Sequence, residues 1–283
     1  MKIMDTIRGA AMTAIIAGTA CTETIDVKFQ ALETGAPDGP RPGMARVAIT
    51  RIEDQPGEIR ILDDMLKVKL DGNYLVHPRQ GTVRAYSVTA QDLFTTLLDI
   101  PVGEHTIELE HVIGGPAGLE DANGDPAVAV PVTLAERSFN ELVVYGAVGA
   151  EQTKVFLDEL RGVPQGSYRA RVMNLLGNPG EVTVLACTTY DSCTTIKSGL
   201  QWGEVWEDVV DIGIRGAAVR PGSTQLLPLL MKTEEPLTPP DPRAFLSTYA
   251  WKLSPSDRSS LTCPYPECNA DAVLVGSYIW IPE

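Results

Sequence analysis

Four of the five cysteines in this 283-residue chain form two closely spaced pairs, and thiols so placed can form disulfides or bind a metal. Five residues separate Cys187 from Cys193, and four separate Cys263 from Cys268. The alternatives are a short-loop disulfide within each pair, which an oxidising compartment favours, and one zinc site ligated by all four thiolates. Because a spacing of five residues is loose for zinc, we expect the disulfides 187–193 and 263–268, one of three possible connectivities.

An acidic turn offers the kind of side chains that bind calcium. Asp121, Asn123 and Asp125 alternate as they do at the start of a calcium-binding loop. The sixth and twelfth positions of that loop are Gly and Glu, whereas this chain has Pro126 and Val132 there. The pattern therefore predicts an unliganded turn, leaves weak calcium binding as the alternative, and indicates no other cofactor.

Two tryptophans are the candidates for contact with a ligand. Trp202 and Trp206 flank Gly203-Glu204-Val205, and on a strand they would share one face. Buried, they would fill a core; exposed, they could stack on sugar rings. The chain lacks the GxSxG motif of hydrolases and the GxxxxGK motif that cradles phosphate. We therefore expect a non-catalytic protein; the alternative is a carbohydrate-binding domain or a cryptic hydrolase that uses both tryptophans and acidic loop residues.

The charge balance limits the class of partner. The chain has 23 Lys and Arg against 37 Asp and Glu, which gives a formal net charge of −14 at pH 7. Because the phosphate backbone needs a positive surface, this balance disfavours nucleic acid, and it disfavours an anionic membrane surface for the same reason. The expected partner is a cell-envelope protein or polysaccharide, with contact to the membrane only through a lipid anchor.

The N-terminus has the layout of a signal peptide over residues 1–20. Two basic residues precede a short apolar run over 10–17, which is too short to span a bilayer, and small residues at 18–20 lead directly to Cys21. This end resembles the lipobox of bacterial lipoproteins, in which Cys21 would be acylated. The alternatives are ordinary cleavage after Ala20 and a cytosolic protein. The resemblance implies an exported protein, anchored by lipid at the outer membrane or cell surface and facing either the outside or the periplasm.

The elements that would position these residues are mostly short strands. Alternation over 46–52 predicts a strand in which Val47, Ile49 and Ile52 mark one face. The segment 91–98 is the best candidate for a short helix. Short strands separated by frequent turn signals predict an all-β fold of immunoglobulin-like antiparallel sandwiches, in which each sheet buries one face and exposes the other.

Matched blocks recur in the two halves of the chain. Three blocks of the first half return in the same order in the second: Ala45-Arg46-Val47 as Ala170-Arg171-Val172, Pro56-Gly57-Glu58 as Pro179-Gly180-Glu181, and Gly81-Thr82-Val83 as Gly203-Glu204-Val205. Because the offset drifts only from 125 to 122 residues, the repeated unit is a domain and not a short solenoid motif. We expect four segments: a signal peptide over 1–20, a lipidated Cys21 with a flexible tether over 21–43, a first sandwich over 44–162, and a second sandwich with the disulfides over 163–283.

These blocks resemble the exported bacterial family called domain of unknown function 4397. The family-like residues are Arg46-Val47, Gly81-Thr82-Val83 with Tyr86, and Pro101-Val102-Gly103 in the first copy, and Arg171-Val172-Met173-Asn174, Gly203-Glu204-Val205 and Pro221-Gly222 in the second. The resemblance implies an exported protein, often a lipoprotein, with two tandem immunoglobulin-like sandwiches. It implies no catalytic residue and no particular ligand.

Overall fold

The chain folds into strands, as the sequence predicts. The computed structural model describes residues 29–31, 39–53, 65–77, 81–82, 84–86, 96–111, 126–147, 149–159, 161–176, 180–189, 192–211, 214–219, 229–230, 244–252 and 272–280. These ranges contain 19 strands and no helix, so the described part of the protein is all-β. No helix long and apolar enough to cross a membrane is found in these ranges.

The first half of the chain forms a sandwich of two sheets, which we call sheets 1 and 2. Sheet 1 contains, in spatial order, β1 (Phe29–Ala31), β4 (Asn73–His77), β3 (Met65–Leu70), β8 (Gly103–His111) and β9 (Pro126–Leu134), with β5 (Gly81–Thr82) beside β4 and β6 (Arg84–Tyr86) beside β3. Sheet 2 contains β11 (Gln152–Phe156), β10 (Phe139–Gly146), β2 (Met44–Glu53) and β7 (Thr96–Pro101).

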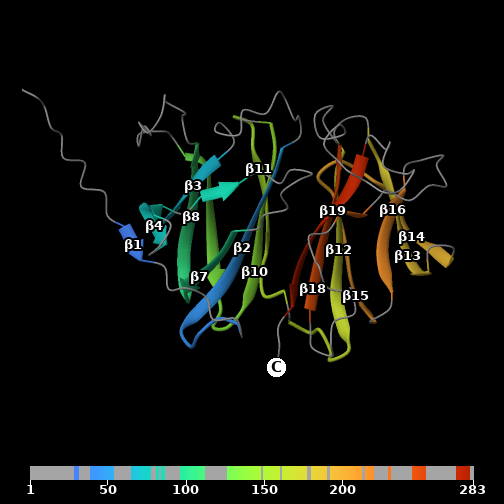
Figure 1. Cartoon of the computed structure of the whole chain (residues 1–283), viewed down its shortest axis with the longest axis horizontal. Coiled ribbons are helices and arrows are strands. Elements are labelled where there is room, and N and C mark those ends of the chain that lie inside the picture. Colours follow the sequence, from blue (N-terminus) through green and yellow to red (C-terminus); the bar gives the residue numbers. More distant parts are fainter. Residues whose placement is uncertain are drawn as a thin grey trace, which may run out of the picture.

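The second half forms another pair, sheets 3 and 4. Sheet 3 contains β15 (Val205–Asp211), β12 (Ser167–Leu175), β18 (Ala244–Lys252), β19 (Ala272–Trp280) and β17 (Leu229–Leu230). Sheet 4 contains β14 (Ser192–Leu200), β13 (Val182–Thr189) and β16 (Arg215–Val219). The four sheets lie in one row, with sheets 2 and 3 in the middle (Figure 1).

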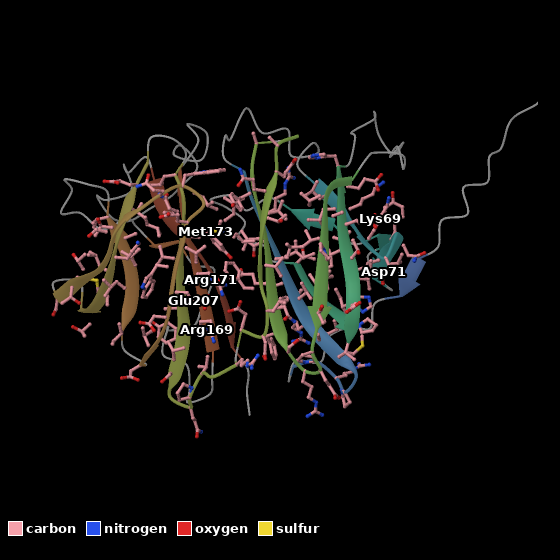
Figure 2. The ribbon with its side chains drawn as sticks, turned by 180° about the vertical axis from the view of Figure 1, so that it is seen from behind. Lys69, Asp71, Arg169, Arg171, Met173 and Glu207 are labelled. Atoms are coloured by element: carbon pink, nitrogen blue, oxygen red, sulfur yellow. A yellow bond between two sulfur atoms is a disulfide. The ribbon has the colours of Figure 1, made fainter. Side chains whose placement is uncertain are left out.

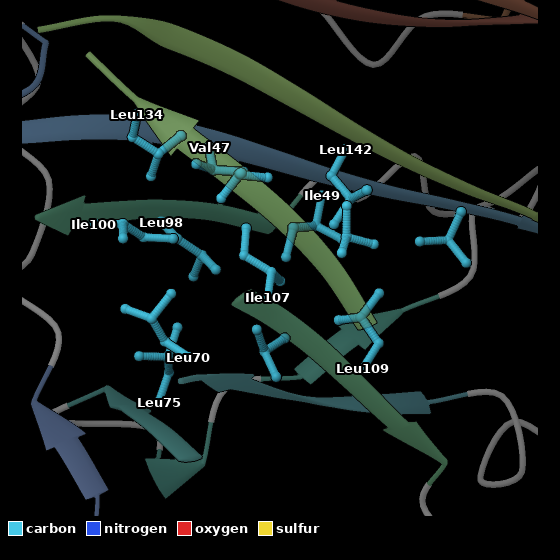
Figure 3. Close-up of a cluster of buried hydrophobic side chains, with 14 of the residues drawn as sticks. Val47, Ile49, Leu70, Leu75, Leu98, Ile100, Ile107, Leu109, Leu134 and Leu142 are labelled. Carbon is cyan, nitrogen blue, oxygen red and sulfur yellow. The ribbon is translucent and has the colours of Figure 1, made fainter. Parts of the chain in front are cut away.

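An apolar layer fills each of the three spaces between neighbouring sheets. Between sheets 1 and 2, side chains such as Val47 and Ile49 of β2 face Ile107 and Leu109 of β8 (Figure 3). Between sheets 3 and 4, a second cluster is centred on Val172 and side chains of β13, and a small satellite cluster extends it along β12. The third layer lies between sheets 2 and 3 and joins the two sandwiches.

The central strands of the two inner sheets are buried on both faces, which the sequence did not predict. All eight residues of β10 are buried, and so are eight of the nine residues of β12. On β2, Ile49 packs between sheets 1 and 2, whereas Ile52 packs between sheets 2 and 3. The expectation that these two residues share a face was wrong, because β2 runs unbroken from 44 to 53 and side chains alternate along it.

Sheets 1, 2 and 3 are mixed, which differs from the wholly antiparallel sandwiches that we expected, whereas sheet 4 is antiparallel throughout. In sheet 2, β2 and β10 pair in parallel over eight residues, and in sheet 3, β12 and β18 do the same. Parallel neighbours need a long crossover connection. All strands of sheet 1 except β1 lie between β2 and β10 in the sequence, and those of sheet 4 lie between β12 and β18, so each outer sheet supplies most of a crossover.

Two expectations about local structure were wrong. Part of the expected tether belongs to the first sandwich: residues 29–31 form β1, which pairs in parallel with β4, and the Gly43 amide donates a hydrogen bond to Glu136. The end of the expected helix over 91–98 is strand, because β7 begins at Thr96 and pairs with β2. Residues 1–28, 32–38 and 91–95 lie outside the described ranges, so the signal peptide and Cys21 stay predictions.

Candidate functional site

The inner sheets enclose a cluster of charged side chains centred on Arg171 of β12. One amino group of Arg171, Nη1, donates a hydrogen bond to Glu141 Oε2 at 2.7 Å. The other, Nη2, donates to both carboxylate oxygens of Glu159, at 2.7 and 2.8 Å. Nη2 and Nε also donate to Glu207 Oε2, at 2.7 and 3.0 Å. A single guanidinium therefore serves three carboxylates from three elements: β10, the segment after β11, and β15. Figure 2 labels Arg171 with Arg169 and Glu207.

Glu141 receives hydrogen bonds from both sandwiches. Its Oε2 accepts from Ser247 Oγ at 2.5 Å and from Arg171, and its Oε1 accepts from the Tyr249 hydroxyl and from Thr50 Oγ1 at 3.4 Å. Thr50 lies on β2 of the first sandwich, whereas Ser247 and Tyr249 lie on β18 of the second. Since a buried charge is tolerated only when it is paired and hydrogen-bonded, this fully buried carboxylate depends on both halves being in place.

The cluster has more negative than positive groups. Arg169 joins Arg171 by donating to Glu207 Oε1 at 2.8 Å, which makes two cations against three carboxylates. Burial raises the pKa of Glu159 to about 7, and the neighbouring Glu141 and Glu207 add to the rise. Burial would also raise the pKa of Glu207, but hydrogen bonds from Arg171 and Arg169 hold it below its usual value. The pKa of Glu159 therefore lies well above the ordinary value for a glutamate, because the effect of its burial outweighs that of its pairing with Arg171.

The same arrangement keeps Arg171 charged. Burial works against its charge, but Glu141, Glu159 and Glu207 together hold its pKa above its usual value. The guanidinium also lies over the ring of Phe156 on β11, with Cζ 3.3 Å from the ring centroid. A cation held over an aromatic face gains further stabilisation when both are desolvated. Arg171 therefore joins the two sandwiches both through its ion pairs and through its packing on Phe156.

Apolar side chains surround this cluster. Six buried residues of the two inner sheets form the layer between them: Ile52, Val143, Tyr145, Met173, Leu175 and Tyr249. Trp202 packs edge-on against Tyr145, with ring centroids 5.4 Å apart. Gly203 follows with a φ of +75°, and a Cβ there would lie 3.3 Å from the Tyr145 hydroxyl. A glycine is thus required where this turn approaches β10.

The two candidate tryptophans do not form one surface. Trp202 lies in the turn before β15 and packs in the layer between the sandwiches. Trp206 lies on β15 and packs against the cores of the second sandwich. The expectation that they share a face required both to lie on one strand, and Trp202 does not. The structure therefore does not bring them together as a platform for a sugar ring.

An equivalent arginine lies at the matched position of the first sandwich. Arg46 donates from Nε and Nη2 to the two carboxylate oxygens of Asp99, at 2.7 and 3.0 Å. Arg46 is directly opposite Asp99 in the β2–β7 register, just as Arg171 is directly opposite Glu207 in the β12–β15 register. The sequence analysis missed both pairs. The signal was present in the repeated Ala-Arg-Val block, where a charged residue recurs between apolar ones.

Of the expected cysteine pairs, the structure describes one. Cys187 and Cys193 form a disulfide and are directly opposite each other in the β13–β14 pairing, as predicted. Cys21, Cys263 and Cys268 lie outside the described residues, and so do Asp121, Asn123 and Asp125. Among the residues that the structure does describe, no group of three or more His, Cys, Asp or Glu side chains is placed to hold a metal ion. The unliganded acidic turn therefore stays a prediction, with weak calcium binding as its alternative.

Comparison with known proteins gives little guidance. No family model matches the chain. No curated protein matches it either. A solved structure from Parabacteroides distasonis ATCC 8503, described as a "Putative cell adhesion protein", is similar over 84% of this chain and 99% of that chain, at 11% sequence identity and a TM-score of 0.22.

Proposed function

We propose that this chain is a non-catalytic, exported module of the bacterial cell envelope, anchored by lipid at Cys21, that presents a binding or scaffolding surface at a fixed distance from its anchor. The observation that carries the proposal is the junction between the sandwiches. Linked domains normally move relative to one another unless their interface is large and apolar. Here an apolar layer and the Arg171 cluster join sheets 2 and 3, so the two sandwiches act as one rigid body.

The arrangement of the sheets supports a spacer. Strand β1, the first described element of the chain, lies at one end of the row, and β13 and β14 lie at the other (Figure 1). An anchor at Cys21 would precede β1 in the sequence and hold the first sandwich nearer the membrane. Sheet 4 would then be the distal surface. Its partner, in this proposal, is a cell-envelope protein or polysaccharide, because the net charge of −14 disfavours nucleic acid.

The catalytic alternative has no support from the cluster itself. Glu141, Glu159 and Arg171 are each no more than 2% exposed, and their hydrogen-bonding groups are used in holding the inner sheets together. In this proposal the cluster is electrostatic and structural. Moving one sandwich relative to the other would separate the paired groups and leave buried charges uncompensated. The cluster therefore fixes the angle between the sandwiches.

Two measurements on the full chain test the two parts of the proposal. For the anchor, cells that express it are grown with an alkyne analogue of palmitate: the wild type should be labelled and membrane-bound, and Cys21→Ser should be unlabelled and released. Label retained by Cys21→Ser contradicts the anchor. For the spacer, ¹⁵N relaxation should give one rotational correlation time for both sandwiches, and two different times would contradict a rigid junction.

A further inference from the structure

The two inner sheets are equivalent parts of the repeat. The matched blocks place Arg46 on β2 and Arg171 on β12. Strand β2 pairs in parallel with β10 and antiparallel with β7, and β12 pairs in the same way with β18 and β15. Strands β10 and β18 in turn pair antiparallel with β11 and β19. All four strands of sheet 2 therefore have a counterpart in sheet 3, in which β17 is additional.

These equivalent sheets face each other across the junction. The order along the row is outer sheet, inner sheet, inner sheet, outer sheet (Figure 1). Two copies related by translation alone would instead bring an inner sheet against an outer one. A two-fold rotation between the copies produces the observed order. It also brings the same surface of each copy into contact, as in a symmetric dimer.

One contact marks the position of this approximate two-fold axis. Ala48 and Met173 each lie two residues after the matched arginine. Glu141 is opposite Ala48 in the β2–β10 pairing, and Tyr249 is opposite Met173 in the β12–β18 pairing, so Glu141 and Tyr249 are at equivalent positions. The Tyr249 hydroxyl donates a hydrogen bond to Glu141 across the junction. Because a two-fold rotation brings equivalent residues together only close to its axis, the axis passes near this pair.

The apolar layer of the junction is built alike from both copies. Each sandwich supplies three of its six buried residues. These residues lie on the equivalent strands β2 and β12 and on the equivalent strands β10 and β18: Ile52, Val143 and Tyr145 in the first sandwich, and Met173, Leu175 and Tyr249 in the second. The same face of the same sheet is therefore apolar in both copies, as in an interface between two like subunits.

The charged residues differ between the two faces and make them complementary. Two copies of the first sandwich would oppose Glu141 to Glu141 at the axis and would lack Arg171. Two copies of the second would leave Arg171 without Glu141 and Glu159, with only Glu207 of its own sheet. Since buried charges without partners are strongly unfavourable, each face fits the other sandwich and rejects its own copy.

We infer that the junction is a subunit-type interface, in which the inner face of each sandwich binds the other sandwich without need of the covalent link. The amides of Asp158 and Glu159 donate to Asn140 and to the Phe139 carbonyl, so the chain up to Glu159 belongs to the first sandwich. The second begins with β12 at 167, which leaves residues 160–166 as the link. This inference rests on the junction of the proposed function and not on the lipid anchor.

Cutting the link in the folded full chain tests the inference. A protease recognition sequence is inserted between Pro164 and Gln165, which are both exposed. After cleavage, sedimentation at roughly 0.1 to 50 µM should show both fragments in one species with the mass of the uncut chain. Fragments that separate at the highest concentration, folded or unfolded, overturn the inference. If the uncut chain still shows one rotational correlation time, the rigid junction of the proposed function stands despite that failure.

Substitutions at the axis test whether the fragments associate through the equivalent faces. Tyr249→Phe removes the hydroxyl that binds Glu141 and should weaken association of the fragments about tenfold. The matched control is Tyr168→Phe, because the Tyr168 hydroxyl is bound to the Ile214 carbonyl within the second sandwich. This control should leave the association unchanged. Tyr249→Glu gives both equivalent positions a carboxylate and should separate the fragments at about 1 µM.

Two further results would overturn the inference. The first is wild-type association in both Tyr249 variants, which would place the contact elsewhere. The second is equal weakening by Tyr168→Phe and Tyr249→Phe, which would mean that general loss of stability is responsible. Circular dichroism of each uncut variant shows whether it is folded. Tyr249→Phe keeps the ring in place, so it decides the test even if Tyr249→Glu does not fold.

Discussion

Replacing Glu159 by Gln should flatten the dependence of stability on pH. Glu159 is 2% exposed and lies within hydrogen-bond distance of Arg171, but three carboxylates compete for the two arginines of the cluster. Around it lie Glu141 on β10, Arg169 and Arg171 on β12, and Glu207 on β15, with the Tyr249 hydroxyl on β18 bound to Glu141. Glu159→Gln removes the energetic cost of ionising this buried carboxyl group.

The size and sign of the effect follow from the raised pKa. In the folded chain the pKa of Glu159 is about 7, against an ordinary value of 4.5. The folded state therefore binds more protons than the unfolded state between these two values. The free energy of unfolding should fall as the pH rises through this window, by about 3 kcal/mol in all, and should be level with respect to this group above it.

Urea denaturation at pH 5 and pH 8, followed by tryptophan fluorescence, measures the effect. Wild type should lose about 2.5 kcal/mol more than Glu159→Gln between these conditions, because the rest of the change lies below pH 5. All other ionisable groups are the same in both proteins, so the difference isolates Glu159. Glu104→Gln is the control, because Glu104 is exposed. If Glu159→Gln keeps the slope of the wild type, the reasoning about the cluster is refuted.

Three further substitutions should change stability by amounts that urea denaturation at pH 7 can resolve. Arg171→Leu should cost about 3–5 kcal/mol, since it leaves buried carboxylates without their cation, and a loss below 1 kcal/mol would contradict the network. Gly203→Ala should cost about 1–2 kcal/mol, because the residue has a positive φ and its Cβ would crowd Tyr145; an unchanged midpoint would show that the turn can move away. Cys187→Ser, compared with the wild type under oxidising conditions, should cost about 2 kcal/mol, as expected for a short closed loop, and the two should become equal once both are reduced.

Local patterns predicted the strands because the alternation of apolar and polar side chains along a strand is visible in residues that are close in the sequence. Alternation in 46–52 predicted β2. The same alternation is present in 66–70, which lies in β3, and the Asp71-Gly72 dipeptide joins β3 to β4 in a turn with a positive φ at both residues. The Cys187–Cys193 pairing was predictable for the same reason, since both residues belong to one hairpin. Such local patterns do not predict the surface against which a sheet packs.

The junction escaped prediction because its contacts join distant parts of the chain. Glu141 and Tyr249 are 108 residues apart, and Glu141 and Ser247 are 106 apart. Nothing local distinguishes a glutamate that will be buried from one that will face water. For the same reason, β1 was taken as part of a tether: its three residues are strand only because β4 lies beside them.

The two matched arginines show how one strand position can serve two purposes. Arg46 is satisfied within its own sheet by Asp99, directly across the ladder. Arg171 has the same in-sheet partner in Glu207, and it recruits two further carboxylates, Glu141 and Glu159, from the first sandwich and the segment that follows it.

The in-sheet pair holds neighbouring strands together, whereas the two additional carboxylates fix one sandwich against the other. It follows that a chain without Glu141 and Glu159 would retain the Arg171–Glu207 pair and both sandwiches but would lose the charged contacts that set their relative orientation. The apolar layer would still hold the sandwiches together in such a chain, so the proposed rigidity of the junction should depend on these two glutamates without requiring a change in either core.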